Sequence, residues 1–511
     1  MTMKKIIIIA VSALAALLAS CNMDKFPHDS ILESDGVQSM ADAKKFRSGI
    51  YMYAKSMFGG GRYSLDEVSG GQFHAMVDFG NANGGLYRWQ MQVTEPSAES
   101  LWYGDYGVIA NMNYAIGAYD KLLKAENSDL TAEEKAELES YKAEAHLVRA
   151  FAYWDLAIKF CVAYVDEDQA KSTFGLPLQT VYAPTSDVSK YPGRSSLYDT
   201  YKLIEDDLLE ALKINAVGTV GYNYFTKDSA KALLARLYLN MRDWQKAAKN
   251  AQELTQSTVY RLASNEQELE GLFIHDTSNE LLFVAYGELN DPHNATGAST
   301  FINDTKDGTG ENCKPNYVPS KNLLGLYDVE KDMRYPIFYK TREVSVSGQQ
   351  PANLELFWKF AGNPIYQKTK GVLNCINAGK IRISEMYLTL AEAAAMMGET
   401  GLQTASDALN ALRASRIKDY VEETYDASSI LGIIKAEWSR EFVGEGFRMV
   451  NLKRWEDDRV MGTPQVAELT YMGSSLNSLD RRITDSRAIW PIPKAEMDVN
   501  PQLKGQQNPG Y

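Results

Sequence analysis

Two stretches of the sequence share one hydrophobic pattern, and it constrains the fold more than any other feature. In each stretch apolar side chains recur at i, i+3, i+4, i+7, i+8 and i+11, which places them on one face of a helix. A short break follows in both, and then a second helix that carries alanines at one face. The apolar positions are Ala230, Leu233, Leu234, Leu237, Tyr238 and Met241 in the first stretch, and Ile383, Met386, Tyr387, Leu390, Ala391 and Ala394 in the second.

These two helix pairs are similar to degenerate tetratricopeptide units. Large side chains on the first helix that meet alanines on the second allow close packing; the alanines are Ala247, Ala248, Ala251, Ala405, Ala408 and Ala411. Residues 100–113 and 143–160 also show helical spacing, with Trp102 and Trp154 among the apolar positions, so we expect both tryptophans in the core. The predicted fold class is mainly α, with a scaffold of helix pairs.

The predicted scaffold is interrupted near residues 58–100 and 257–375. Glycine-rich segments at 58–63 and 80–85 argue against helix there, because glycine loses much conformational entropy when it is ordered. Alternation of apolar and polar residues predicts a short strand over Tyr87–Val93, and residues 279–289 are also typical of a strand. Residues 290–317 form a long polar segment, and long loops in compact domains are usually functional.

Aromatic residues in these irregular segments lie near asparagines and aspartates, which suits a sugar-binding site. An aromatic ring offers a flat apolar face to a sugar, and neighbouring amides and carboxylates bind the hydroxyl groups. The alternative is that the rings belong to the core, which is about equally favoured for the tryptophan on the predicted strand. The candidate ligand-binding residues are Tyr63, Phe73, Asp78, Asn81, Asn83, Trp89, Tyr286, Asn290, Asp291, Asn294, Trp358 and Tyr366.

The densest charged stretch contains Glu437, Glu441 and Glu445, which recur every fourth residue on a predicted helix. Two interpretations are open: a carboxylate pair for acid–base hydrolysis of a glycoside, or ion pairs with arginines such as Arg440 and Arg448. Carboxylates one turn apart on one helix point along the same side and leave no room for a substrate between them. The sequence therefore favours the structural ion pairs.

No other catalytic or cofactor pattern emerges. Residues 303–314 imitate a calcium loop, with Asn303, Thr305, Asp307 and Gly308 in place, but Lys314 stands where a bidentate glutamate belongs. We therefore expect no cofactor, with calcium as a weak alternative. The five histidines are scattered, and no nucleophile elbow or phosphate-binding loop occurs. A net charge of −13 without a basic run excludes a nucleic-acid partner.

The N-terminus predicts a lipid anchor. Lys4 and Lys5 precede a short apolar run that ends in Leu18-Ala19-Ser20-Cys21, which is typical of a bacterial lipoprotein signal. The run is too short to span a bilayer comfortably, and an ordinary secretory signal is the alternative. We expect residues 1–20 to be removed, Cys21 to carry the lipid, and residues 21–511 to form one domain with the irregular insertions described above.

Several segments, in order along the whole chain, resemble those of the SusD/RagB family of outer-membrane nutrient-binding lipoproteins. They are WYGDYGVIANMN (102–113), AEAHLVRAFAYWDL (143–156) with GLPL (175–178), KIRISEMYLTLAEA (380–393), ALNALRASR (408–416), EFVGEGFRMVNLKRW (441–455) and the ending WPIPKAEMDVNPQLKGQQNPGY (490–511). Two positions depart from the family pattern, with Trp438 where arginine is common and Asn451 where aspartate is common.

The resemblance implies four tetratricopeptide-like helix pairs with an irregular lobe that carries the ligand site. It also implies a lipid-anchored protein on the outside of the outer membrane, which binds a glycan and delivers it to a SusC-like TonB-dependent transporter. A peptide ligand, as in some relatives, is the alternative within this class, and a glycoside hydrolase is the alternative outside it. The family's ligand residues are not fixed by motif, so the candidate residues come from the aromatic segments alone.

Overall fold

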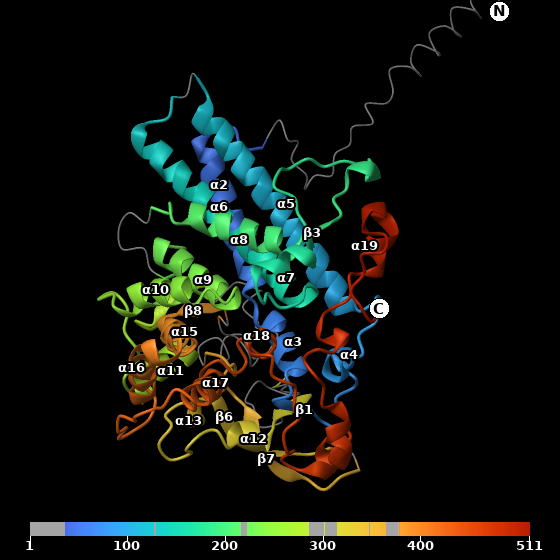
Figure 1. Cartoon of the computed structure of the whole chain (residues 1–511), viewed down its shortest axis with the longest axis vertical. Coiled ribbons are helices and arrows are strands. Elements are labelled where there is room, and N and C mark those ends of the chain that lie inside the picture. Colours follow the sequence, from blue (N-terminus) through green and yellow to red (C-terminus); the bar gives the residue numbers. More distant parts are fainter. Residues whose placement is uncertain are drawn as a thin grey trace, which may run out of the picture.

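The computed structural model describes residues 36–126, 129–215, 222–285, 301, 314–346, 348–363, 377 and 379–511. Helices dominate these residues, and the short strands lie in two-stranded antiparallel pairs (Figure 1). The predicted mainly α class is confirmed. Within the described ranges, none of the helices combines the length and hydropathy needed to cross a bilayer.

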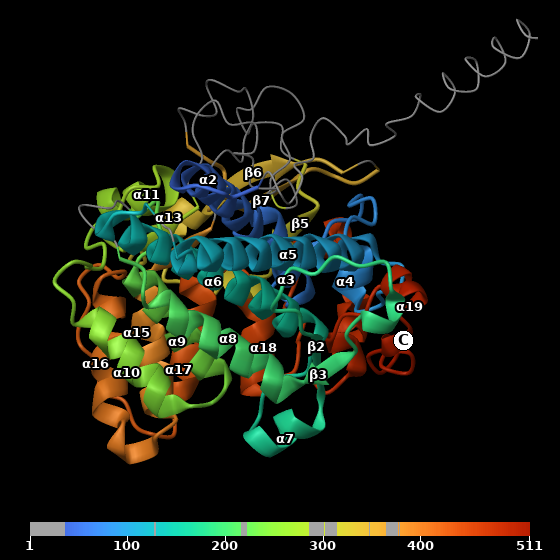
Figure 2. The ribbon, with the colours of Figure 1, turned by 90° about the horizontal axis from the view of Figure 1, so that it is seen from above.

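The longest helices, α5 (Pro96–Lys124) and α6 (Ala132–Phe160), pack against each other along their length (Figure 2). Thr131 and Glu134 form a capping box that starts α6. α6 also contacts α2 (Met40–Met57) and α8 (Leu197–Ala211). Side chains of α6 from Leu138 to Phe160 belong to one continuous hydrophobic core.

Both predicted helix pairs are present, as α9 (Lys227–Asn240) with α10 (Trp244–Thr255) and α15 (Ile383–Ala395) with α16 (Leu402–Ala414). The second helix of the first pair packs on the first helix of the second pair, so the repeats stack although about 130 residues separate them. The other helices are α3 (Gly60–Ser69), α4 (Gly84–Arg88), α7 (Glu167–Ser172), α11 (Glu266–Ile274), α12 (Lys321–Leu324), α13 (Tyr335–Phe338), α17 (Ile430–Glu441), α18 (Arg448–Trp455) and α19 (Lys494–Val499).

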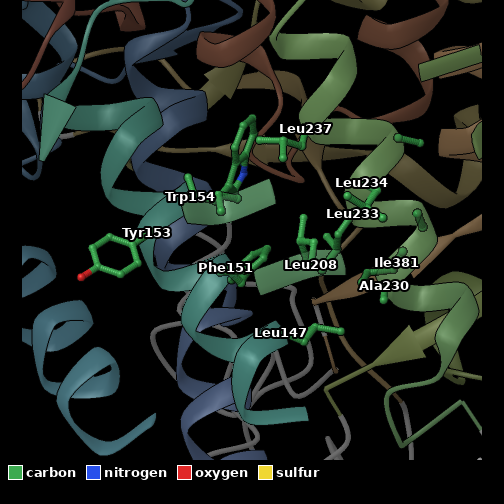
Figure 3. Close-up of a cluster of buried hydrophobic side chains, with 14 of the residues drawn as sticks. Leu147, Phe151, Tyr153, Trp154, Leu208, Ala230, Leu233, Leu234, Leu237 and Ile381 are labelled. Atoms are coloured by element: carbon green, nitrogen blue, oxygen red, sulfur yellow. The ribbon is translucent and has the colours of Figure 1, made fainter. Parts of the chain in front are cut away.

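The core of the helical scaffold lies where α6, α8 and α9 meet. Phe151 and Trp154 point from α6 towards leucines of α8 and α9, while Tyr153 points away on the other side of α6 (Figure 3). Trp102 is 2% exposed and Trp154 6% exposed, so the prediction that both belong to the core is confirmed. Local helical spacing in the sequence thus identified the main core.

A second, separate hydrophobic cluster fills the irregular lobe, which we define as β1, β5, β6, β7 and residues 461–479. β1 (Phe73–Ala75) pairs with β5 (Tyr317–Pro319), and β6 (Tyr339–Val344) pairs with β7 (Ala352–Phe357). The remaining strands are β2 (Phe174–Pro177) with β3 (Arg194–Ser196) and β4 (Leu281–Val284) with β8 (Lys380–Arg382). β4 confirms the strand expected within residues 279–289.

Two local predictions are wrong. Residues 87–93 are no strand, because α4 ends there and Trp89 adopts a left-handed conformation (φ 54°) as its C-cap. The glycine-rich segments 58–63 and 80–85 do not exclude helix, because Gly60 and Gly61 form the first turn of α3, and Gly84 and Gly85 begin α4. The first residues of a helix need no partner for their N–H groups within the helix, so glycine costs least there once tertiary contacts hold the turn.

Candidate functional site

Three of the candidate ligand residues lie in one loop, residues 76–83 between β1 and α4. Asp78 and Asn81 are exposed and Asn83 is half-buried. Asn81 (φ 59°) and Asn83 (φ 54°) have left-handed backbone conformations, which asparagine tolerates better than most residues. The Tyr317 hydroxyl of β5 donates a hydrogen bond to the Ala82 carbonyl at 2.6 Å and holds the loop in place.

The C-terminal part of the chain holds the other side of this loop. Backbone hydrogen bonds run from Val77 N to Leu469 O at 2.9 Å and from Tyr471 N to Ala75 O at 2.8 Å. The rings of Phe79, Tyr87, Tyr317 and Tyr471 contact one another with centroids 5.0–6.4 Å apart. The C-terminal segment accordingly lies beside α4 and β1 (Figures 1 and 2). The loop thus rests on a rigid aromatic base.

The exposed and half-buried side chains above this base form a mixed surface that we call the loop surface. Arg88 donates a hydrogen bond to Asn81 Oδ1 at 2.9 Å, and its guanidinium lies 6.0 Å from the centre of the Tyr471 ring. Tyr471 is half-buried, so part of this residue lies at the surface. The loop surface consists of Val77, Asp78, Asn81, Arg88, Tyr471 and Met472.

The chemistry of the loop surface suits a hydroxyl-rich ligand. A partly exposed aromatic ring provides an apolar face, and an amide, a carboxylate and a guanidinium provide acceptors and donors around it. Sequence reasoning missed Arg88, Tyr471 and Met472. Tyr471 lies almost 400 residues from Asn81 in the chain, so no local pattern could have placed it here.

Phe73 and Trp89 do not present free rings, and the expectation that they stack on a ligand is wrong in this structure. Phe73 is fully buried between Phe301 and Phe357, with ring centroids 4.6 and 5.3 Å away. The Trp89 indole donates to the Ser69 carbonyl at 3.0 Å, and the Arg459 guanidinium covers its ring at 4.7 Å. The core alternative holds for both side chains.

Tyr63 and Trp358 lie apart from the loop surface. Tyr63 lines an internal cavity of about 40 Å³ between α3, α6 and α9, and burial raises the pKa of its hydroxyl. Trp358 is half-buried just after β7, with Lys340 Nζ 4.9 Å and Arg342 Cζ 5.4 Å from its ring centre. Among the described residues, no hydrogen bond or ring contact joins Trp358 to Asp78, Asn81 or Asn83.

The remaining candidates lie outside the described residues. They are Tyr286, Asn290, Asp291, Asn294 and Tyr366, together with the lipidation residue Cys21 and positions 303–308 of the calcium-like loop. Within the part of the chain that the structure describes, no three His, Cys, Asp or Glu side chains are grouped so that they could hold a metal ion.

The three glutamates of the charged stretch are buried in an ion-pair network, which we call the arginine–glutamate network. Glu441 contacts Arg334 at 2.8 Å, Arg416 at 2.9 Å and also Arg382. All four side chains are fully buried. The other members are Glu280, Asp332, Lys359, Glu437, Arg440 and Glu445, so the network joins α13, α17, β8 and the ends of β4 and β7.

The electrostatics of this network favour the structural interpretation. Burial by itself would raise the pKa of Glu437, but the Arg440 and Arg334 guanidiniums outweigh it and lower the pKa to about 2. The pKa of Glu441 is likewise lowered, far below its usual range, by three arginines. Carboxylates that are ionised, enclosed and fully paired cannot act as a general acid. The prediction of structural ion pairs is confirmed, although Arg448 turns to the Gly70 carbonyl instead of a glutamate.

The two departures from the family pattern, Trp438 and Asn451, both line the internal cavity of about 40 Å³. Among the described residues, Trp438 Nε1 and Asn451 Oδ1 have no hydrogen-bond partner. Neither belongs to the arginine–glutamate network, which is complete without them. The departures therefore change the polar lining of one cavity and leave the ion pairs intact.

Comparison with known proteins agrees with this architecture. A family model described as "SusD family" matches residues 356–511, and one described as "Starch-binding associating with outer membrane" matches residues 51–239. No curated protein sequence matches the chain.

Solved structures match nearly the whole chain. A SusD superfamily protein from Bacteroides thetaiotaomicron is 25% identical with a TM-score of 0.75, over 92% of this chain and 100% of that one. A SusD-like carbohydrate-binding protein from Bacteroides vulgatus is 18% identical with a TM-score of 0.71, over 92% of this chain and 98% of that one, and this likeness concerns the fold alone. Since two family models match separate parts of the sequence and solved SusD superfamily structures match 92% of the chain, the chain belongs to the SusD/RagB family.

Proposed function

We propose that the protein is a non-catalytic lipoprotein of the outer membrane that binds a glycan at its loop surface. The observation that carries this proposal is the half-buried Tyr471, which is fixed on an aromatic base and joined to Asn81 through the side chain of Arg88. A preformed ring with polar groups at its edge loses little entropy when a sugar stacks on it. The family membership and the carbohydrate-binding description of a structural relative support the same ligand class.

The delivery step is the second part of the proposal. The lipid at Cys21 would tether the protein to the cell surface, beside a SusC-like TonB-dependent transporter that takes up the bound glycan. No cofactor enters this scheme. A Cys21→Ala variant is expected to leave the membrane fraction and to stop co-purifying with the transporter, while it keeps its fold. Retention in washed membranes would contradict the anchor.

A titration of glycans into the soluble chain that starts at Asn22 tests the binding step. Tyr471→Ala should weaken binding about thirtyfold, because a central aromatic contact typically contributes about 2 kcal/mol. Tyr103→Ala is the control, since Tyr103 is an exposed tyrosine on another element, α5. Equal affinity of both variants and the parent would place the ligand elsewhere.

The same samples distinguish the alternatives. Chromatography of a long incubation with the bound oligosaccharide should show no shorter products, whereas a glycoside hydrolase would release them. Titration with a peptide mixture covers the remaining alternative. Binding of peptides without binding of any glycan would replace the proposed ligand class.

A further inference from the structure

Five arginines lie near Trp89, and none of them forms an ion pair with a residue that the structure describes. Arg88, Arg459, Arg481, Arg482 and Arg487 all lie more than 4.0 Å from any carboxylate oxygen of the described residues. In the arginine–glutamate network, by contrast, every guanidinium meets a carboxylate within 3 Å. The whole chain carries a net charge of −13, so a cluster of uncompensated cations is an exception that needs an explanation.

Three of these arginines line a surface hollow of about 710 Å³ next to α4. We call it the arginine hollow; its main lining residues are Trp89, Asp480, Arg481, Arg482, Asp485 and Arg487. Arg481 donates only to carbonyl oxygens, those of Ser478, Asp480 and Arg88. Arg482 is exposed, and Arg487 lies 5.0 Å from the Tyr511 ring. A guanidinium has five N–H donors, so these contacts leave donors for a ligand.

The two aspartates of the arginine hollow neutralise it only in part. Asp480 Oδ1 accepts a hydrogen bond from Met461 N at 2.7 Å, and Asp485 Oδ1 accepts one from Arg487 N at 2.9 Å. Both carboxylates thus serve to hold the backbone of the C-terminal segment. With two aspartates against three arginines, the lining keeps an excess of positive charge.

A buried cation lies beneath the hollow and strengthens its positive potential. Arg459 is fully buried against the Trp89 ring and donates to the carbonyls of Ser69, Tyr87 and Leu479. Burial lowers the pKa of Arg459 to about 9, and the neighbouring charge of Arg481 acts in the same direction. A charge in a medium of low dielectric constant acts over a longer distance than one in water.

The arginine hollow is continuous with the loop surface through Arg88. The Arg88 carbonyl accepts a hydrogen bond from Arg481 at 3.2 Å, while its side chain lies at Tyr471 on the loop surface. A ligand that stacks on Tyr471 can therefore extend past Arg88 into the hollow. We propose that the arginine hollow binds the carboxylate or sulfate group of an acidic sugar, so that the glycan bound by this protein is anionic. This inference rests on the proposed function.

A pair of ligands that differ in charge, and otherwise only by one methyl group at each carboxyl group, tests the inference. We would titrate the soluble chain that starts at Asn22 with an oligogalacturonate and with its fully methyl-esterified form. Guanidinium–carboxylate contacts are strong when bidentate, so the acidic form should bind at least about tenfold more tightly. Added salt should weaken the binding of the acidic form and leave the binding of the neutral form unchanged.

Variants then locate the effect. Arg482→Gln combined with Arg487→Gln should remove the preference for the acidic form and leave the affinity for the esterified form unchanged. If the double variant has a lower melting temperature than the parent, the single variant Arg482→Gln replaces it in the titration. The Arg482 side chain is exposed and makes no hydrogen bond or ion pair with the described residues, so its loss should not affect folding. Arg261→Gln is the matched control, since it removes an exposed arginine that pairs with Glu268 on another surface.

The outcomes separate this inference from the proposed function. Equal binding of both oligosaccharides, or a preference that survives the double variant, would overturn the anionic ligand and leave glycan binding in place. Failure to bind either of them or any other glycan would overturn the proposed function and the inference together.

Discussion

The helical scaffold and the irregular lobe are stabilised by different means. In the scaffold, helices contribute side chains at regular spacing to one apolar core that includes Trp102, Phe151 and Trp154. In the irregular lobe, short strands and loops supply aromatic side chains, and the arginine–glutamate network lies where the lobe meets the scaffold. In helices the backbone N–H and C=O groups bond to one another, whereas in loops these groups depend on specific partners elsewhere in the chain.

The distances along the chain differ in the same way. The two halves of a helix pair follow each other within a few residues. Arg334 and Glu437 are 103 residues apart, and Arg416 and Glu280 are 136 residues apart. Each helix pair is thus encoded locally, whereas the ion pairs where the irregular lobe meets the scaffold form only after folding.

Glu441→Gln should give the largest loss of stability. It removes one carboxylate that compensates three fully buried guanidiniums, and loss of one partner of a buried ion pair costs about 5 kcal/mol at the upper end of the usual range. Chemical denaturation of the parent and the variant measures the difference in the free energy of unfolding.

The control is Glu133→Gln, which alters an exposed glutamate in the first turn of α6. Such surface changes usually stay within about 0.5 kcal/mol. An unchanged stability for Glu441→Gln would show that the irregular lobe does not depend on its network, and the contrast between the two regions would fail.

Trp102→Ala should destabilise the scaffold by about 4 kcal/mol, since truncation of a buried tryptophan leaves a cavity. Trp102→Phe keeps most of the volume and should cost far less. Thermal melts of both variants test this expectation. A melt of Trp102→Ala that matches the parent would contradict its place in the core.

Glu67→Gln should change the pH dependence of stability. Burial raises the pKa of Glu67 from its ordinary value of 4.5 to about 7, with the Asp66 carboxylate acting in the same direction. Between these two pH values the unfolded chain has lost a proton that the folded chain keeps, so the parent loses stability as the pH rises from 4.5 to 7. The loss amounts to about 3 kcal/mol.

The glutamine variant lacks this proton, so its stability relative to the parent should increase over the same pH window and then stay constant. Denaturation at pH 4, 5.5, 7 and 8, values chosen about the two pKa limits of Glu67, follows the difference. A constant difference across the window would mean that Glu67 is ionised in the folded protein. It would then resemble the ionised carboxylates of the arginine–glutamate network.

Much of the fold follows from the sequence. The spacing of Leu233, Leu237 and Met386 identified both helix pairs, because one face of a helix must be apolar to pack. The every-fourth-residue spacing of the glutamates correctly indicated ion pairs. It did not reveal that Arg334, Arg382 and Arg416 would be their partners, since these come from other elements.

The candidate site was predicted only in part. Asp78 and Asn81 lie at the loop surface as expected for exposed polar residues in a glycine-rich segment. Phe73 and Trp89 were expected beside them but are buried, because a ring in an irregular segment can turn inward as easily as outward. The Trp89 ring turns inward because Trp89 is the C-cap of α4 and the Arg459 guanidinium packs over its ring.

By itself the sequence determined the helical scaffold, the class of the fold and the structural role of the charged stretch, because local periodicity and charge spacing carry that information. Only the tertiary structure decided which rings are buried, that Arg88 joins Tyr471 to Asn81, and that five arginines near Trp89 have no carboxylate partner among the described residues. These juxtapositions join segments several hundred residues apart, and their free energy arises only when the packed core brings the segments together.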